Sequence, residues 1–209
     1  PHQGESHIHF NPQLYLRHQF SSRWSLQASA ILQHQSESPE GFYPNTYYAD
    51  YRTLVQMKKE IERTQSQNYM LYIEYKRPVK EFFWTLMLNH FNIQRDYLTH
   101  SGYQDGVFHL TSLAHRYHTE SYQAKSIISK GFYDWNLKTS LEVIYNYGKG
   151  TQAGQGSIQP YKSHWLSMKP KVDWNPTHWL SASYQANFNQ SQTCISTSLP
   201  ALWDIQQRL

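Results

Sequence analysis

The chain has few of the features that most function classes require. Its 209 residues include one cysteine, Cys194, so an internal disulfide framework is excluded. No stretch approaches the roughly 18–20 consecutive apolar residues of a transmembrane helix, and a helical membrane protein is therefore excluded. The net charge is only +4 and the lysines are spread out. Nucleic-acid binding is not indicated, because it prefers a clustered basic face.

Patterns for catalysis and metal binding are also lacking. The acidic residues between positions 37 and 62 are scattered, which fits solvated surface charge better than a catalytic carboxylate pair. His115 and His118 would point to opposite faces of a strand, which disfavours joint metal binding. The glycine-rich segment 148–160 lacks the GxxxxGK[ST] spacing of a phosphate-binding loop, so a flexible loop is expected there. The sequence predicts no enzyme, no catalytic residue, no metal site and no cofactor.

Aromatic residues are what the chain has in excess. They make up 16% of the sequence, with 17 Tyr and 7 Trp, although the mean hydropathy is as low as −0.75. A soluble domain has such a profile, and so does a transmembrane β-barrel, whose strands are half polar.

The segment from His164 to Phe188 alternates most regularly. Apolar residues occupy every second position on both sides of an expected turn at 175–178, and a tryptophan (Trp174, Trp179) flanks each side of that turn. Period-two alternation is typical of a β-strand with one apolar and one wet side. Each arm has about ten residues, the length of a transmembrane β-strand, and aromatic residues mark the membrane interfaces of such strands. The segment predicts a membrane β-hairpin.

Similar segments recur along the chain. Strands are also expected at 13–20, 24–33, 68–75, 84–90, 121–130, 135–147 and from Leu202 onward. The register of 121–130 cannot be fixed from its pattern, and Pro170 requires a bulge, because proline donates no ladder hydrogen bond. The further short turns are 21–23, 77–80 and 131–134, and the long connections are 36–60, 95–119, 148–160 and 189–200. The first of these connections is expected to be irregular, and residues 107–113 of the second are expected to form a strand that extends beyond the membrane. Short turns at one end and long loops at the other are typical of outer-membrane barrels.

The amino-acid sequences of several segments resemble those of a known family. The runs YRTL (51–54), RTQSQNY (63–69), YKRPVKEFF (75–83), SKGFYDW (129–135) and NPTHWLS (175–181) resemble the barrel of TonB-dependent outer-membrane receptors of Bacteroidetes. The resemblance implies a 22-stranded barrel with an N-terminal plug that imports a ligand with energy relayed by TonB. Residues 1–209 would be an internal part of that barrel, about nine strands, with the plug and the other strands outside this chain.

The fold class expected is therefore all-β, an antiparallel up-and-down transmembrane β-barrel in part. The expected function is an outer-membrane receptor or transporter for TonB-dependent uptake, located in the bacterial outer membrane. Its partners would be membrane lipid, the TonB complex through other parts of the protein, and a solute that is a glycan, a peptide or a metal chelate. The alternative is a soluble secreted β-sandwich or lectin-like binding module, whose apolar faces would meet in a core.

Ligand-binding residues are expected in the first long loop. Phe42, Tyr43, Tyr47 and Tyr48 lie close together there, and tyrosine offers rigid, amphipathic contact area for a solute. The other interpretation of these residues is that they pack the loops onto one another.

Overall fold

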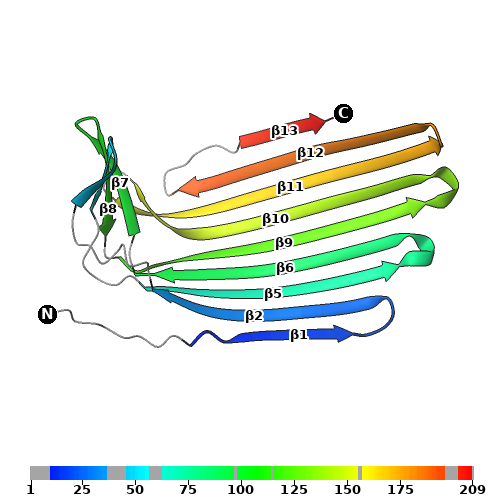
Figure 1. Cartoon of the computed structure of the whole chain (residues 1–209), viewed down its shortest axis with the longest axis horizontal. Coiled ribbons are helices and arrows are strands. Elements are labelled where there is room, and N and C mark those ends of the chain that lie inside the picture. The colour runs from blue at the N-terminus through cyan, green and yellow to red at the C-terminus, as the bar shows by residue number, and fades with distance from the viewer. Residues whose placement is uncertain are drawn as a thin grey trace.

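The computed structural model describes residues 10–36, 46–56, 63–96, 98–113, 115–154, 157–195 and 202–208. These residues form a nine-stranded sheet and a separate four-stranded sheet, here called the small sheet (Figure 1). The large sheet has the order β1-β2-β5-β6-β9-β10-β11-β12-β13, and every neighbouring pair is antiparallel. The expected all-β, up-and-down antiparallel fold is confirmed. The sheet is open, with β1 and β13 as its edges in the described part of the chain.

Most strands of the large sheet are far longer than the usual five or six residues of a strand. Their bounds are β1 Gln13–Gln19, β2 Trp24–Ser36, β5 Arg63–Arg77, β6 Phe82–Arg95, β9 Tyr117–Phe132, β10 Leu137–Gly154, β11 Ser157–Thr177, β12 Leu180–Ile195 and β13 Leu202–Arg208. The strands between the two edges have 13 to 21 residues. Within the described ranges, no helix is long and apolar enough to cross a bilayer.

The short turns lie together at one end of the large sheet, as the sequence predicts (Figure 1). Two of them are single 3-10 turns, η2 (Pro78–Lys80) and η3 (Tyr133–Trp135). Each is followed by a residue in the left-handed region, Glu81 at φ 47° and Asn136 at φ 46°. A turn that ends in one left-handed residue is a common hairpin connection, because it restores the strand twist.

The opposite end carries the small sheet, built from the two longest connections. Its strands are β3 (Thr46–Asp50), β4 (Thr53–Gln56), β7 (Leu98–Gln104) and β8 (Val107–Leu113), in the order β3-β4-β8-β7. The β4–β8 pair is parallel and joins the two hairpins. Asp105 and Gly106 both have positive φ, as a two-residue type I′ turn requires. The prediction of an irregular first connection is therefore wrong for its described part, which contains β3 and β4, whereas the strand expected at 107–113 is confirmed as β8.

The predicted glycine-rich loop at 148–160 is also wrong. β10 continues to Gly154 and β11 begins at Ser157, so only two residues separate the paired strands. A Cβ on Gly150 would lie 3.0 Å from the Tyr161 ring, and Gly150 and Tyr161 are cross-strand partners. The tyrosine ring occupies the space that the glycine leaves, which keeps a glycine-containing strand covered.

Proline produces a break in pairing at Pro170 and not the expected bulge. The pairs Met168↔Phe188 and Lys171↔Gln185 belong to the same register, and pairing between β11 and β12 is interrupted between them. The missing N–H removes a ladder bond without requiring an extra residue. The register shift lies instead between Trp174 and Thr177, so β11 extends through the turn expected at 175–178 and the link is His178–Trp179.

Candidate functional site: an exposed apolar face with an aromatic border

The register separates the large sheet into two chemically different faces. The face here called the apolar face carries Leu14, Leu16, Leu26, Ala28, Leu71, Ile73, Leu86, Leu88, Ile128, Leu137, Leu141, Val143, Leu166, Met168, Val172, Leu180, Ala182, Tyr184 and Phe188. The other face, here called the polar face, carries residues such as Lys138, Glu142, Ser181 and Gln185. The predicted division of the strands between two faces is confirmed.

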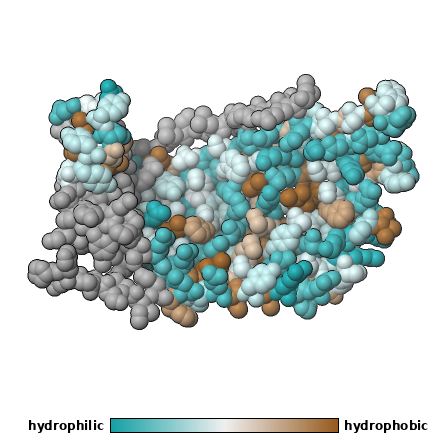
Figure 2. Space-filling model, in the orientation of Figure 1, coloured by the Kyte–Doolittle hydropathy of each residue, from teal (hydrophilic) through white to brown (hydrophobic). Residues whose placement is uncertain are grey.

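The apolar face is exposed or half-buried along its length, apart from the buried Ala186 on β12. Leu14 is 70% exposed, and even Met168, well inside the sheet, is 38% exposed. Val55 in the small sheet and Ala186 are the buried hydrophobic residues of the described chain. Figure 2 shows one face of the molecule, on which most of the described residues are hydrophilic and the hydrophobic ones stand in small groups. Among the residues described, then, nothing packs on the apolar face to make a conventional core.

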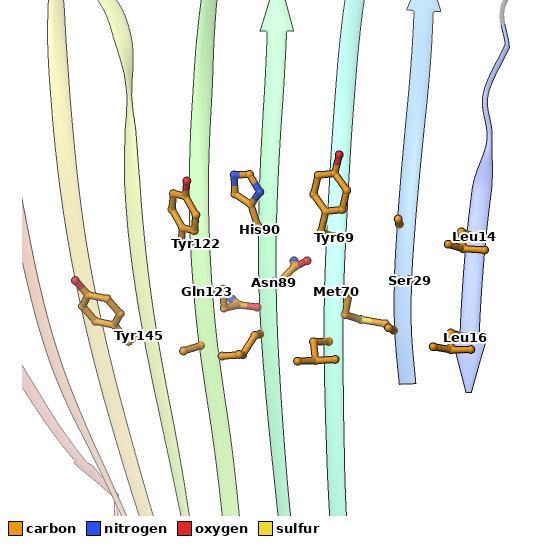
Figure 3. Close-up of a pocket in the computed structure, with 15 residues that line it drawn as sticks. Leu14, Leu16, Ser29, Tyr69, Met70, Asn89, His90, Tyr122, Gln123 and Tyr145 are labelled. Carbon is orange, nitrogen blue, oxygen red and sulfur yellow. The ribbon is translucent and has the colours of Figure 1, made fainter. Parts of the chain in front are cut away.

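A row of stacked rings borders the apolar face toward the small sheet. The row, here called the aromatic row, consists of Tyr69, His90, Tyr122, Tyr147 and His164, one from each of five adjacent strands and all direct cross-strand partners. Successive ring centroids are 5.9, 4.4, 6.1 and 4.9 Å apart. Three of these rings stand side by side in Figure 3.

Aromatic residues also gather at the turn end of the same face. The Trp24 ring lies 4.7 Å from that of Tyr75 and 6.0 Å from that of Trp84. The Trp174 indole N–H donates to the carbonyl of Trp135 at 3.1 Å. Trp174 and Trp179, which the sequence places beside the turn, are 47% and 74% exposed.

Between these two aromatic borders the apolar face carries one charged residue on β2, β5, β6, β9, β10, β11 and β12 in the described ranges, Lys130 of β9, which lies next to the turn-end border. On β11 the borders are His164 and Trp174. Ten residues span ~33 Å along a strand, which at a tilt of ~40–45° corresponds to a band of ~25 Å. That height equals the apolar band of a transmembrane barrel.

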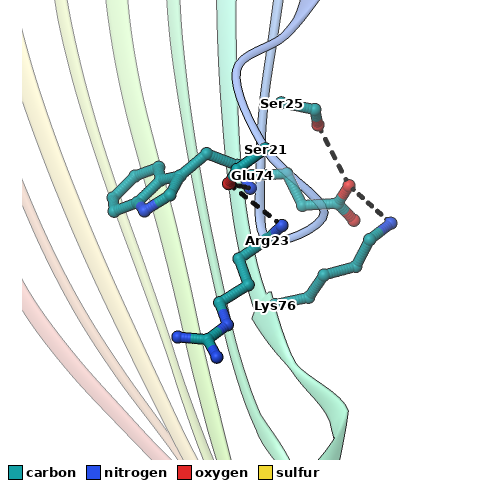
Figure 4. A network of polar contacts seen from close by, with 6 residues as sticks. Ser21, Arg23, Ser25, Glu74 and Lys76 are labelled. Atoms are coloured by element: carbon teal, nitrogen blue, oxygen red, sulfur yellow. Dashed lines mark hydrogen bonds and ion pairs between the residues drawn. The ribbon is translucent and has the colours of Figure 1, made fainter.

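The polar face is held by ion pairs and hydrogen bonds between strands. The Glu142 carboxylate lies 2.8 Å from the Lys125 ammonium and 3.1 Å from that of Lys169, linking β9, β10 and β11. Near the turn end, the Ser25 hydroxyl and the Lys76 ammonium both donate to Glu74 at 3.2 Å (Figure 4). The charged and polar side chains of this face suit contact with water or a polar solute.

A groove of about 590 Å³ runs across the apolar face beside the aromatic row (Figure 3). Leu14 and Leu16 of β1 form one wall, and Ala28, Ala30 and Ala124 contribute small side chains to it. The groove offers almost no hydrogen-bonding partner, so it suits a hydrocarbon chain better than a polar ligand.

The predicted ligand-binding tyrosines are only partly placed together. Tyr47 and Tyr48 lie on β3 of the small sheet, 42% and 65% exposed. As consecutive strand residues they point to opposite sides, so they do not form one stacking surface. Phe42 and Tyr43 lie outside the described residues. Sequence reasoning missed Tyr103 on β7, which is 70% exposed in the same sheet.

Metal binding finds no support in the ranges that the structure describes, since no three His, Cys, Asp or Glu residues are grouped to hold an ion. His118 lies instead 3.2 Å from the Glu120 carboxylate. No protein-family model matches the chain, and the comparisons with curated proteins and with solved structures found no match. The function is therefore inferred from the two faces of the sheet and from its two ends.

Proposed function

We propose that this chain forms part of the wall of an outer-membrane barrel, a receptor or transporter for TonB-dependent uptake of a solute. One observation carries the proposal: between two aromatic borders the large sheet presents an exposed apolar face, on which Lys130 is the one charged residue in the described ranges, and this face backs onto a polar face. A bilayer provides the apolar surroundings that this face lacks in water, and aromatic residues prefer the two interfaces.

Backbone hydrogen bonding agrees with this location. Strands can cross a bilayer only when their N–H and C=O groups are paired, and the inner strands of the large sheet are paired on both sides. Further strands of the same protein would pair with β1 and β13.

The two ends of the sheet supply the orientation. Two to four residues connect the strands at the turn end, whereas the other end carries the small sheet. In outer-membrane barrels the short turns are periplasmic and the long loops extracellular. The uptake role, and coupling to a TonB complex through parts outside this chain, rest on the resemblance of the turn segments to TonB-dependent receptors.

The soluble alternative, a secreted β-sandwich or lectin-like module, fits these observations less well. A sandwich buries its apolar faces against each other, and its strands are mostly short. Here the apolar face is exposed among the described residues, and the strands between the edges have at least 13 residues. A protein that stays monodisperse in buffer without detergent would favour the sandwich.

A pair of neighbouring substitutions tests the membrane proposal. Leu141 lies on the apolar face between Ile128 and Pro170, while Ser140 lies on the polar face. We expect Leu141→Arg to destabilise the protein folded in lipid vesicles, lowering its free energy of unfolding by about 2–4 kcal/mol, the cost of a charge at the bilayer midplane. Ser140→Arg is the matched control and should cost much less. Equal costs for the two variants would refute the assignment of the lipid face.

A further inference from the structure

A row of charged residues follows the aromatic row on the apolar face. Glu120, Lys149 and Lys162 are direct cross-strand partners on β9, β10 and β11, each two residues beyond Tyr122, Tyr147 or His164 toward the small sheet. Two residues span ~7 Å along a strand. The headgroup region on each side of a bilayer is roughly 5–7 Å thick. If the apolar face meets lipid, these charges lie at the level of the headgroups.

The charges in this row do not cancel. Lys149 and Lys162 are directly opposite each other, an arrangement that destabilises a sheet when nothing compensates it. Glu120 neutralises one of them, because its carboxylate lies 2.9 Å from the Lys149 ammonium. Lys162 is exposed and has neither a hydrogen bond nor an ion pair within the described part of the chain.

The Glu120 carboxylate already has three partners. Besides the Lys149 ammonium, the Tyr122 hydroxyl donates to it at 3.0 Å and His118 Nε2 lies 3.2 Å away. The carboxylate is committed to these partners, and the second ammonium remains for another anion.

A groove of about 490 Å³ opens at this point. His118, Lys149, Pro160, Lys162 and Cys194 are among its lining residues. Its cationic walls lie directly beyond the aromatic row, so a molecule bound there would continue onto the apolar face.

We propose that this groove binds the phosphate group of an anionic membrane lipid, with Lys162 and Lys149 as its cationic partners and the acyl chains lying on the apolar face. The inference rests on the proposed membrane location. A cation near an anionic surface contributes about 1 kcal/mol, which corresponds to about a fivefold change in affinity. At the turn end the Lys130 ammonium instead donates to the Lys80 carbonyl, so the same kind of site is not repeated there.

The test uses the full-length protein in detergent, with lipid binding counted by native mass spectrometry. The probes are phosphatidic acid and phosphatidylcholine of the same chain length, with inorganic phosphate as a separate competitor. We expect phosphatidic acid to bind more tightly than phosphatidylcholine, and Lys162→Gln to weaken it about fivefold. Lys138→Gln removes one positive charge from the polar face and is the matched control, which should leave binding unchanged.

Three outcomes would overturn the lipid site: equal binding of the two lipids, an equal loss in both variants, or displacement of the lipid by low millimolar inorganic phosphate. Flotation of the wild-type protein with phosphatidylcholine vesicles is measured first. A protein that floats but shows one of these outcomes lacks the site and keeps the proposed membrane function. A protein that does not float refutes both proposals.

Discussion

Gly131 in β9 lies where the turn between β5 and β6 folds against the sheet. Its backbone N–H donates to the Glu81 carbonyl at 2.9 Å, and a Cβ at this position would lie 2.8 Å from the Glu81 Cβ. Glu81 itself has φ 47°, a conformation that favours glycine. The turn therefore depends on a residue without a side chain in the neighbouring strand.

We expect Gly131→Ala to destabilise the full-length protein by about 1–3 kcal/mol in urea unfolding from lipid vesicles, the usual cost of overpacking. Adding Glu81→Gly removes the opposing Cβ and should restore most of the loss. Glu81→Ala removes the carboxylate, whose Oε2 would overlap the new Cβ, but keeps the Glu81 Cβ at 2.8 Å, so it should restore a smaller part of the loss. Equal rescue by both second substitutions would show that the Cβ contact is not the cause.

Asp50 is a second residue whose environment has a measurable consequence. Its carboxylate accepts the Arg52 backbone N–H at 2.8 Å in the β3–β4 turn. That bond and a bond from the Thr53 hydroxyl lower the pKa of Asp50 below its usual 3.8. A lowered pKa means that the contribution to stability is present above the unfolded pKa and is lost as the pH falls through the folded one.

We therefore expect the Arg52 amide to exchange faster with solvent as the pH falls below about 4, after correction for the intrinsic rate. Hydrogen exchange read by NMR measures this directly. Asp50→Asn should show faster exchange already at pH 6 and little further change on acidification. A wild-type profile that is flat down to pH 2 would contradict the expectation.

At the scale of elements, the small sheet is the candidate for first contact with solute. Tyr47 and Tyr48 point to opposite sides of β3, so each side of the sheet presents one of these rings. If the four aromatic residues of the first long connection capture solute, changing Phe42, Tyr43, Tyr47 and Tyr48 to Ser should weaken ligand binding to whole cells at unchanged surface expression. Tyr103→Ser on β7 is a comparison variant in the same sheet. Unaltered affinity would assign the four residues to loop packing.

Elements with regular alternation could be predicted from sequence, and those without it could not. In the segments 135–147 and 164–174 the local sequence shows which residues lie on the apolar face and which on the polar face, because period-two alternation is a local property. In β9 the apolar face includes Ser126 and Lys130 while the polar face includes Ile127, so only pairing with β10 fixes the register.

Long-range pairings explain the remaining failures. The small sheet depends on a parallel pairing of Thr53 with Phe108, which no local pattern signals. The aromatic row requires the registers of five strands at once, and two of its rings are histidines, which the alternation of apolar residues does not single out. The aromatic row can be recognised only when the registers of these strands are known.

At the scale of the whole molecule, the two ends should face different compartments. Val79 in the turn between β5 and β6 is 96% exposed, and Tyr51 in the small sheet is 84% exposed. With Cys194→Ser as background, Tyr51→Cys should react with a membrane-impermeant maleimide on intact cells. Val79→Cys should react only after the outer membrane is permeabilised. Reaction of both cysteines on intact cells would contradict the proposed orientation.

The parallel pairing of β4 with β8 also affects the order in which the strands of the two sheets form. The hairpins β5–β6, β9–β10 and β11–β12 are closed by short turns and need only local contacts, which form fast. β4 and β8 are separated in the chain by the β5–β6 hairpin, so their pairing closes a long loop and comes late. During biogenesis the turn at Tyr51 should therefore remain accessible to proteases after the β5–β6 hairpin has formed. It should become protected only when β8, in the second long connection, pairs with β4.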